Sequence, residues 1–223
     1  MSKLAFIFPG QGAQKAGMGK DFYENSEAAR SFFDNAQKIL DFDLKEMCFG
    51  EHEELNLTEY TQPCMVSVCL AIVQELKKRG ITPDITAGLS LGEYAAVAAA
   101  GGMNELDAIK LVRRRGILMQ STVPAGEGAM AAVLGLDAKK IEEILESFEN
   151  VWIANYNCPG QIVITGLTNE VQQASLALKE AGAKRVVELK VSGPFHSLLL
   201  KPAGEALLKE MESMSFSTLQ VPY

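Results

Sequence analysis

The spacing of apolar and polar residues along the chain predicts alternating strands and helices. An apolar stretch from Lys3 to Phe8 indicates a first strand, and apolar residues recur with helical spacing over 26–40 and 61–78. A short apolar strand starting at Ile85 precedes the alanine-rich run 94–100, which favours a helix. This half of the chain therefore reads as an α/β protein.

The composition changes near Pro124, where a second order of elements begins. The pattern predicts, in turn, a strand over 129–136, a helix over 137–148, strands over 151–157 and 161–165, a helix over 169–181 and a strand over 184–190. The order βαββαβ is that of a ferredoxin-like domain. We therefore expect a large domain made of residues 1–125 and 191–223, with a small domain inserted at 126–190.

Composition narrows the possible functions. The chain has 223 residues, of which 48% are hydrophobic and 22% charged, as in a soluble globular protein. No apolar run is long enough to cross a membrane, and the first one is too short for a signal peptide, which favours a cytoplasmic location. The net charge of −7 disfavours binding to nucleic acid. The four cysteines form no CxxC pair, so we expect buried free thiols and no metal site.

Residues 88–92, Gly-Leu-Ser-Leu-Gly, form a Gly-x-Ser-x-Gly motif between the predicted strand and helix. This context is typical of a nucleophile elbow, in which a strained turn exposes the serine hydroxyl. Gly88 and Gly92 would let strand and helix approach closely. The N–H of Leu91 would lie at the helix N-terminus, where it can stabilise an oxyanion formed by attack of Ser90. The alternative is a tight turn in which Ser90 only caps the helix.

A nucleophilic serine needs a base, and the chain has two histidines. His52 lies in an acidic stretch and is expected at the surface. His196 follows Gly193-Pro194-Phe195, a constrained turn that can aim a side chain, and it is the candidate base. The alternative is a loop histidine that only forms a hydrogen bond. No carboxylate stands out as a third partner.

Two further stretches carry candidate binding residues. The glycine-rich loop 9–19 matches neither common phosphate-binding pattern, so its backbone and the Gln11 side chain are expected to line a site at the end of the first strand. Arg113, Arg114 and Arg115 are consecutive, and successive helical residues point about 100° apart. One of the three can therefore face inward while another faces solvent.

Five motifs occur in order along the chain: Phe-Pro-Gly-Gln-Gly-Ala-Gln at 8–14, Gly-Leu-Ser-Leu-Gly-Glu-Tyr at 88–94, Arg-Gly-x-x-Met-Gln at 115–120, Asn-x-Asn-x-Pro-Gly-Gln at 155–161 and Gly-Pro-Phe-His-Ser at 193–197. Together they resemble the malonyl-CoA:acyl carrier protein transacylase family of fatty acid synthesis. The resemblance implies an α/β-hydrolase-like large domain with a parallel sheet, carrying a ferredoxin-like inserted domain.

The resemblance also implies the site and the reaction. Ser90 would be acylated with His196 as base, Arg115 would bind the malonyl carboxylate, and Gln11 with the Leu91 N–H would form the oxyanion hole. The malonyl group would pass from malonyl-CoA to the phosphopantetheine thiol of acyl carrier protein, with no metal or other cofactor. Phe195 fits the malonyl-selective pattern, whereas Leu89 stands where members often have histidine. The family is longer, so the large domain is expected to be incomplete at its C-terminus.

Acyl carrier proteins are acidic, so a chain of net charge −7 must attract them locally. The candidate contacts are Lys184, Arg185 and Lys190, with Arg113, Arg114 and Lys201 as further cations; the alternative is scattered, solvated charge. Rival functions are a serine hydrolase or thioesterase, an acyltransferase domain of a polyketide synthase, and a scaffold without enzymatic activity.

Overall fold

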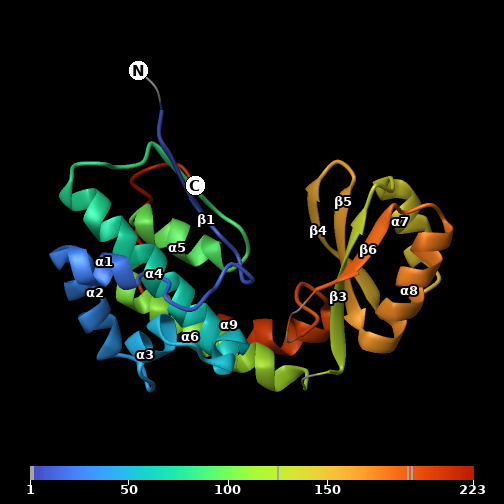
Figure 1. Cartoon of the computed structure of the whole chain (residues 1–223), viewed down its shortest axis with the longest axis horizontal. Helices are drawn as coiled ribbons and strands as arrows, with labels where there is room; N and C mark the ends of the chain where they lie inside the picture. Colours follow the sequence, from blue (N-terminus) through green and yellow to red (C-terminus); the bar gives the residue numbers. More distant parts are fainter. Residues whose placement is uncertain (1–2, 125, 190, 192) are drawn as a thin grey trace. The chain divides into compact units, whose positions relative to one another are not determined.

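The structure is a computed structural model that describes residues 3–124, 126–189, 191 and 193–223 (Figure 1). By their contacts the residues divide into two compact units, one of Met1–Ile117 with Leu207–Tyr223 and one of Leu118–Ala206. The boundaries fall inside two helices, α6 (Glu105–Thr122) and α9 (Lys201–Glu212). The domain limits predicted from the sequence, at 125/126 and 190/191, stay a prediction.

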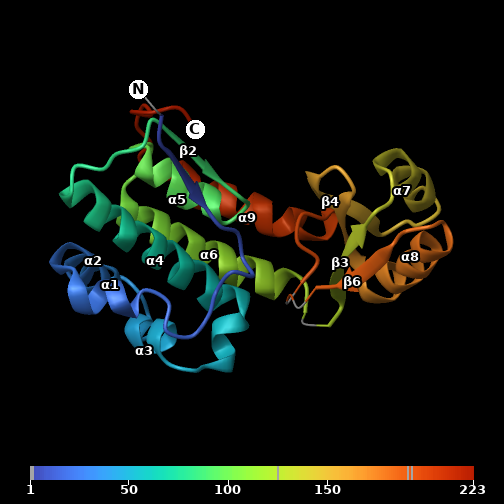
Figure 2. The same ribbon diagram turned by 45° about the horizontal axis from the view of Figure 1, so that its top comes forward.

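The first unit contains a parallel pair of strands, β1 (Ala5–Phe8) and β2 (Ile85–Gly88), in register from Ala5 opposite Ile85 to Phe8 opposite Gly88. Its other elements are α1 (Lys20–Asn25), α2 (Glu27–Gln37), α3 (Leu44–Phe49), the 3₁₀ helix η1 (Glu53–Asn56), α4 (Thr58–Lys78) and α5 (Gly92–Ala99). Figure 2 shows α5 beside β2. The predicted parallel sheet is confirmed, and it places the end of β2 next to the end of β1.

Helix α4 forms the centre of this unit's hydrophobic core, to which it contributes Cys64, Val66, Leu70 and Val73. It begins at Thr58, three residues before the predicted start. Pro63 therefore lies inside the helix, where it has no N–H to donate to the carbonyl oxygen of Glu59. Arg113 Nη1 donates to that oxygen instead, at 2.8 Å. A side chain from α6 thus compensates for a proline within α4.

The second unit contains β3 (Gly128–Leu134), α7 (Ala138–Leu145), β4 (Val151–Cys158), β5 (Gln161–Leu167), α8 (Thr168–Glu180) and β6 (Arg185–Glu188). The strands pair antiparallel in the order β4-β5-β3-β6. The predicted ferredoxin-like order is confirmed. Figure 1 shows α7 and α8 on one face of this sheet, where Ile141 and Leu178 pack against Val133 and Ile164.

Several details follow from local chemistry. Asn104 caps α6 as predicted, because its Oδ1 accepts from the N–H groups of Leu106 and Asp107 at 2.9 and 3.3 Å. The expectation of buried cysteines is wrong for Cys158, which is exposed near the end of β4.

In the part of the chain that the structure describes, no helix has the length and apolar character needed to span a membrane.

Candidate active site

Ser90 lies in the turn between β2 and α5 with a φ of 50°. Among the described residues, only Ser90 and His196, at 60°, combine a positive φ with a side chain. The left-handed region is unfavourable for such residues and persists where the surrounding structure enforces it, often at functional sites. The nucleophile and base predicted from the sequence thus share a left-handed backbone conformation that no other described non-glycine residue adopts.

The glycines on either side of the elbow permit a close approach, as predicted. A Cβ on Gly88 would collide with the backbone of Gly92 and Glu93. A Cβ on Gly92 would collide with the carbonyl groups of Phe8 and Pro9 at the end of β1. The elbow is therefore packed directly against the start of the glycine-rich loop.

The start of this loop also contacts Leu89, the residue before Ser90. The Leu89 N–H donates to the Phe8 carbonyl at 3.1 Å, and a Cβ on Gly10 would come within 2.9 Å of the Leu89 carbonyl oxygen. Leu91, which is buried, stands at the N-terminus of α5. Residues 8–10, at the start of the loop that carries Gln11, therefore contact Leu89 and Gly92, which flank Ser90 in the sequence.

The Gln11 side chain is held by the first turns of α4. Its Nε2 donates to Thr58 Oγ1 at 3.2 Å, and its Oε1 accepts from Gln62 Nε2 at 3.4 Å. Thr58 and Gln62 are both buried. These contacts anchor the loop to α4 through the side chain and fix the course of its backbone past the elbow.

Arg115 faces inward on α6. Its guanidinium lies 5.5 Å from the centre of the Tyr94 ring, and Tyr94 lies in the first turn of α5, four residues after Ser90. Burial lowers the pKa of Arg115, partly offset by the oxygen of Tyr94 and by Glu93. The side chain still carries its charge at neutral pH. Within the described residues, no carboxylate lies within 4.0 Å of this guanidinium.

Arg113 and Arg114 have different surroundings. Arg113 Nε and Nη2 each lie 2.9 Å from an oxygen of Asp41, and Nη1 lies 3.0 Å from Glu59 Oε2. Arg114 is exposed and pairs with Glu210 at 2.8 Å. The predicted difference in orientation along the arginine run is confirmed: Arg114 faces solvent, whereas Arg113 and Arg115 are half-buried.

His196 projects from a firmly held turn in the second unit. Phe195 is buried with Met130 and Val163, and a Cβ on Gly128 would collide with the ring of Pro194. The Phe195 N–H donates to the Gly193 carbonyl at 3.0 Å, and His196 itself is exposed. Ser90 belongs to the first unit, so the pairing of these two residues stays a prediction.

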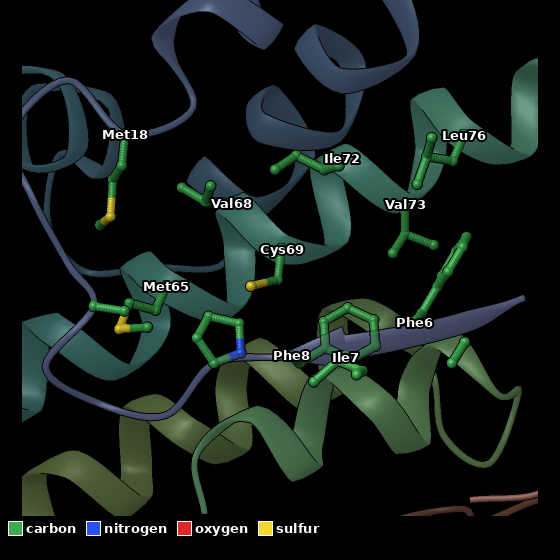
Figure 3. Close-up of a pocket in the computed structure, with 13 residues that line it drawn as sticks. Phe6, Ile7, Phe8, Met18, Met65, Val68, Cys69, Ile72, Val73 and Leu76 are labelled. Carbon is green, nitrogen blue, oxygen red and sulfur yellow. The ribbon is translucent and has the colours of Figure 1, made fainter. Parts of the chain in front are cut away.

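An apolar cavity of about 400 Å³ lies between β1 and α4 (Figure 3). Phe6, Phe8, Met65 and Cys69 are among the residues that line it, and none of the described residues in its lining is charged. Ser90 and Arg115 do not line it. An apolar wall offers nothing to a carboxylate or a phosphate, so this cavity is separate from the candidate active site.

The acyl transferase domain family model matches residues 5–223. The malonyl CoA-acyl carrier protein transacylase of Bacillus subtilis is 48% identical over the whole chain. This chain belongs to the malonyl CoA-acyl carrier protein transacylase family. It spans 72% of the B. subtilis protein and 66% of the Staphylococcus aureus member, which is 47% identical over 90% of the chain.

A solved structure of a malonyl-transacylase in complex with a type II polyketide synthase acyl-carrier protein has the same fold. It superposes with a TM-score of 0.95 at 40% identity, over 99% of this chain and 73% of that one. The acyltransferase fold with a parallel and an antiparallel sheet is therefore shared with members of the family.

The candidate residues fall into groups within this family fold. Gln11, Ser90, Leu91 and Arg115 lie in the first unit, where the loop and the elbow are in contact. In the second unit Lys184 and Arg185 are exposed, and no carboxylate of the described residues lies within 4.0 Å of them. Lys190 lies outside the described residues, and Lys201 is 3.8 Å from Glu205. His52 Nε2 lies 3.0 Å from Glu46 Oε1.

Sequence reasoning missed Thr58, Gln62 and Tyr94 as parts of the site. A signal existed for Gln62, which continues the apolar stripe of Val66 and Leu70 at a spacing of four residues. A polar residue in such a stripe is buried and must find a partner. Tyr94 carried no comparable signal, because its neighbour Arg115 comes from another helix.

Proposed function

We propose that this protein transfers the malonyl group of malonyl-CoA to the phosphopantetheine thiol of acyl carrier protein, through an ester on Ser90. The B. subtilis and S. aureus relatives carry the name of this activity. The observation that carries the proposal is the half-buried guanidinium of Arg115, which lies against Tyr94 near the elbow and has no carboxylate partner among the described residues. A carboxylate at the end of the acyl group would supply that partner.

In the first half-reaction, the Ser90 hydroxyl attacks the thioester carbonyl while His196 accepts its proton. The carbon–oxygen bond forms, the carbonyl oxygen becomes an oxyanion, and the carbon–sulfur bond then breaks. The proton on His196 passes to the sulfur as free CoA leaves. This sequence leaves a malonyl ester on Ser90 and returns His196 to its neutral form.

In the second half-reaction, the thiol of the carrier's phosphopantetheine gives its proton to His196 and attacks the ester. The new thioester forms, the bond to Ser90 Oγ breaks, and the proton returns to Ser90. No electron transfer and no metal-bound water is needed, so the proposal includes no cofactor.

The proposed oxyanion hole combines the Leu91 N–H with Gln11. Because the Gln11 side chain is anchored to Thr58 and Gln62, we assign the donated hydrogen bond to the Gln11 backbone N–H. Backbone donors held in place before the reaction stabilise the developing charge without reorganisation. In this scheme Arg115 binds the carboxylate through two parallel N–H groups, a geometry that lysine lacks.

A serine hydrolase would use the same elbow with water as acceptor. The experiment that separates the two supplies malonyl-CoA with and without holo acyl carrier protein, and follows malonyl carrier protein and free malonate in the same sample. The proposal predicts malonyl carrier protein as the main product and slow release of malonate. Rapid malonate release that is independent of carrier protein would establish a hydrolase instead.

For the carrier protein, Lys184, Arg185 and Lys190 are the proposed contacts. Lys184 and Arg185 are exposed beside and within β6, which suits electrostatic attraction of an acidic partner. Lys184→Glu should raise the KM for carrier protein while the KM for malonyl-CoA stays the same. Lys139→Glu, an exposed change on α7, is the matched control; equal KM values for carrier protein in both variants would exclude this surface. The proposal places the reaction in the cytoplasm, which cell fractionation would test.

A further inference from the structure

Tyr94 is the side chain on which the Arg115 guanidinium rests. The guanidinium carbon lies 5.5 Å from the ring centre, within the range of a cation–π interaction. Tyr94 belongs to α5, the helix that begins at the elbow, whereas Arg115 comes from α6. The helix that follows the candidate nucleophile therefore also carries the aromatic ring that contacts Arg115.

The Tyr94 ring is itself well held. It packs against the hydrophobic core of the first unit, and burial raises the pKa of its hydroxyl. The phenol therefore stays protonated and uncharged at neutral pH. The phenol oxygen also favours the charged form of Arg115, which partly offsets the effect of burial on its pKa. Ring face and oxygen together restrict both the position and the tilt of the guanidinium plane.

An uncharged support differs from a carboxylate in one respect that matters for binding. A carboxylate would orient the guanidinium and also neutralise it, as Asp41 does for Arg113. The acidic side chain that affects the pKa of Arg115 is Glu93, which is exposed. Tyr94 thus orients the cation and leaves its positive charge for an anionic ligand.

We infer that Tyr94 is a positioning residue that sets the preference for malonyl over acetyl groups by orienting Arg115. This inference rests on the proposed function. A flexible guanidinium would spend part of its time away from the carboxylate and would lose entropy on binding it, so the KM for malonyl-CoA should rise. Acetyl-CoA has no carboxylate, and its kinetics should change little.

The test measures kcat/KM for malonyl-CoA and acetyl-CoA in variants at position 94. In Tyr94→Leu the ratio of the two values should fall about tenfold, mostly through the KM for malonyl-CoA. In Tyr94→Phe, which keeps the ring, the fall should be about threefold. Tyr60→Leu is the matched control, because the Tyr60 ring lies 4.9 Å from a guanidinium that is already paired, that of Arg113. Its ratio should stay at the wild-type value.

A second variant keeps the inference testable if Tyr94→Leu does not fold. Pentafluorophenylalanine at position 94 keeps the size of the ring but reverses the charge on its face. Its ratio should fall below that of Tyr94→Phe, and equal ratios in these two variants would overturn the inference. A folded Tyr94→Leu with the wild-type ratio would do the same. A wild-type protein without preference for malonyl-CoA would instead contradict the proposed function.

Discussion

Arg113 and Arg115 stand two residues apart on α6 and lie in opposite electrostatic surroundings. Both guanidiniums rest on aromatic rings, Arg113 on Phe42 and Tyr60, and Arg115 on Tyr94. Arg113 has two carboxylates and a backbone carbonyl as acceptors. Arg115 has no carboxylate within 4.0 Å in the described part of the chain.

The difference separates an arginine that holds the fold together from one that is ready to bind. The contacts of Arg113 join α6 to the loop at Asp41 and to the start of α4, and they replace the donor that Pro63 lacks. Moving a cation out of water without an ionic partner costs free energy. Such a residue is tolerated where a bound anionic ligand supplies the missing partner. Under the proposed function, the same residue type on one helix serves stability at position 113 and substrate recognition at position 115.

The largest expected effect tests the binding half of this comparison. Arg115→Ala should lower kcat/KM for malonyl-CoA by roughly two to three decades, because the carboxylate would be buried without a partner. Acetyl-CoA should be used almost as before. Steady-state kinetics with both substrates measure this, and equal losses on the two substrates would remove Arg115 from carboxylate recognition.

For Arg113, the comparison predicts a loss of stability and no change in substrate preference. Arg113→Ala should lower the free energy of unfolding by about 2 kcal/mol, since it leaves Glu59 and the backbone of α4 without their donor. Urea unfolding followed by circular dichroism measures the loss. The ratio of malonyl-CoA to acetyl-CoA kinetics should not change, and a change as large as that of Arg115→Ala would erase the distinction between the two arginines.

The smallest effect concerns pH. The hydrogen bond from Arg113 lowers the pKa of Asp41 in the folded protein. A carboxylate with a lowered folded pKa contributes stability above its unfolded pKa of about 4, and this contribution disappears as the pH falls through the folded value. Asp41 is largely exposed, so Asp41→Asn should cost only about 0.5 kcal/mol at pH 7. The difference between variant and wild type should shrink below pH 4; a constant difference would show that charge plays no part.

The sequence predicts local features of the site well and long-range ones poorly. The elbow could be predicted because strand, glycines, serine and helix are all within 85–100. The βαββαβ order was equally readable, because each of its elements has its own periodicity. The roles of Arg113 and Arg115 could not be separated, since they depend on whether Asp41 or Tyr94, from distant parts of the chain, comes alongside.

The start of α4 shows the same limit. The apolar spacing predicts a helix that begins at Thr61. The helix begins at Thr58, and Arg113, 54 residues after Glu59, donates to the Glu59 carbonyl in place of the N–H that Pro63 lacks. The earlier start brings Thr58 into the helix, where its hydroxyl accepts from Gln11. A contact from a distant part of the chain therefore supports a first helical turn that the local pattern did not predict.

The most direct test of the account is to find the acyl group on the protein. Equal amounts of malonyl-CoA and acetyl-CoA are mixed with the protein, and the intact mass is measured within seconds, followed by peptide mapping. The account predicts an added mass of about 86 Da, the value for a malonyl ester, located on Ser90 and absent from Ser90→Ala. An acetyl adduct in excess, an adduct that persists in Ser90→Ala, or no adduct at all would contradict it.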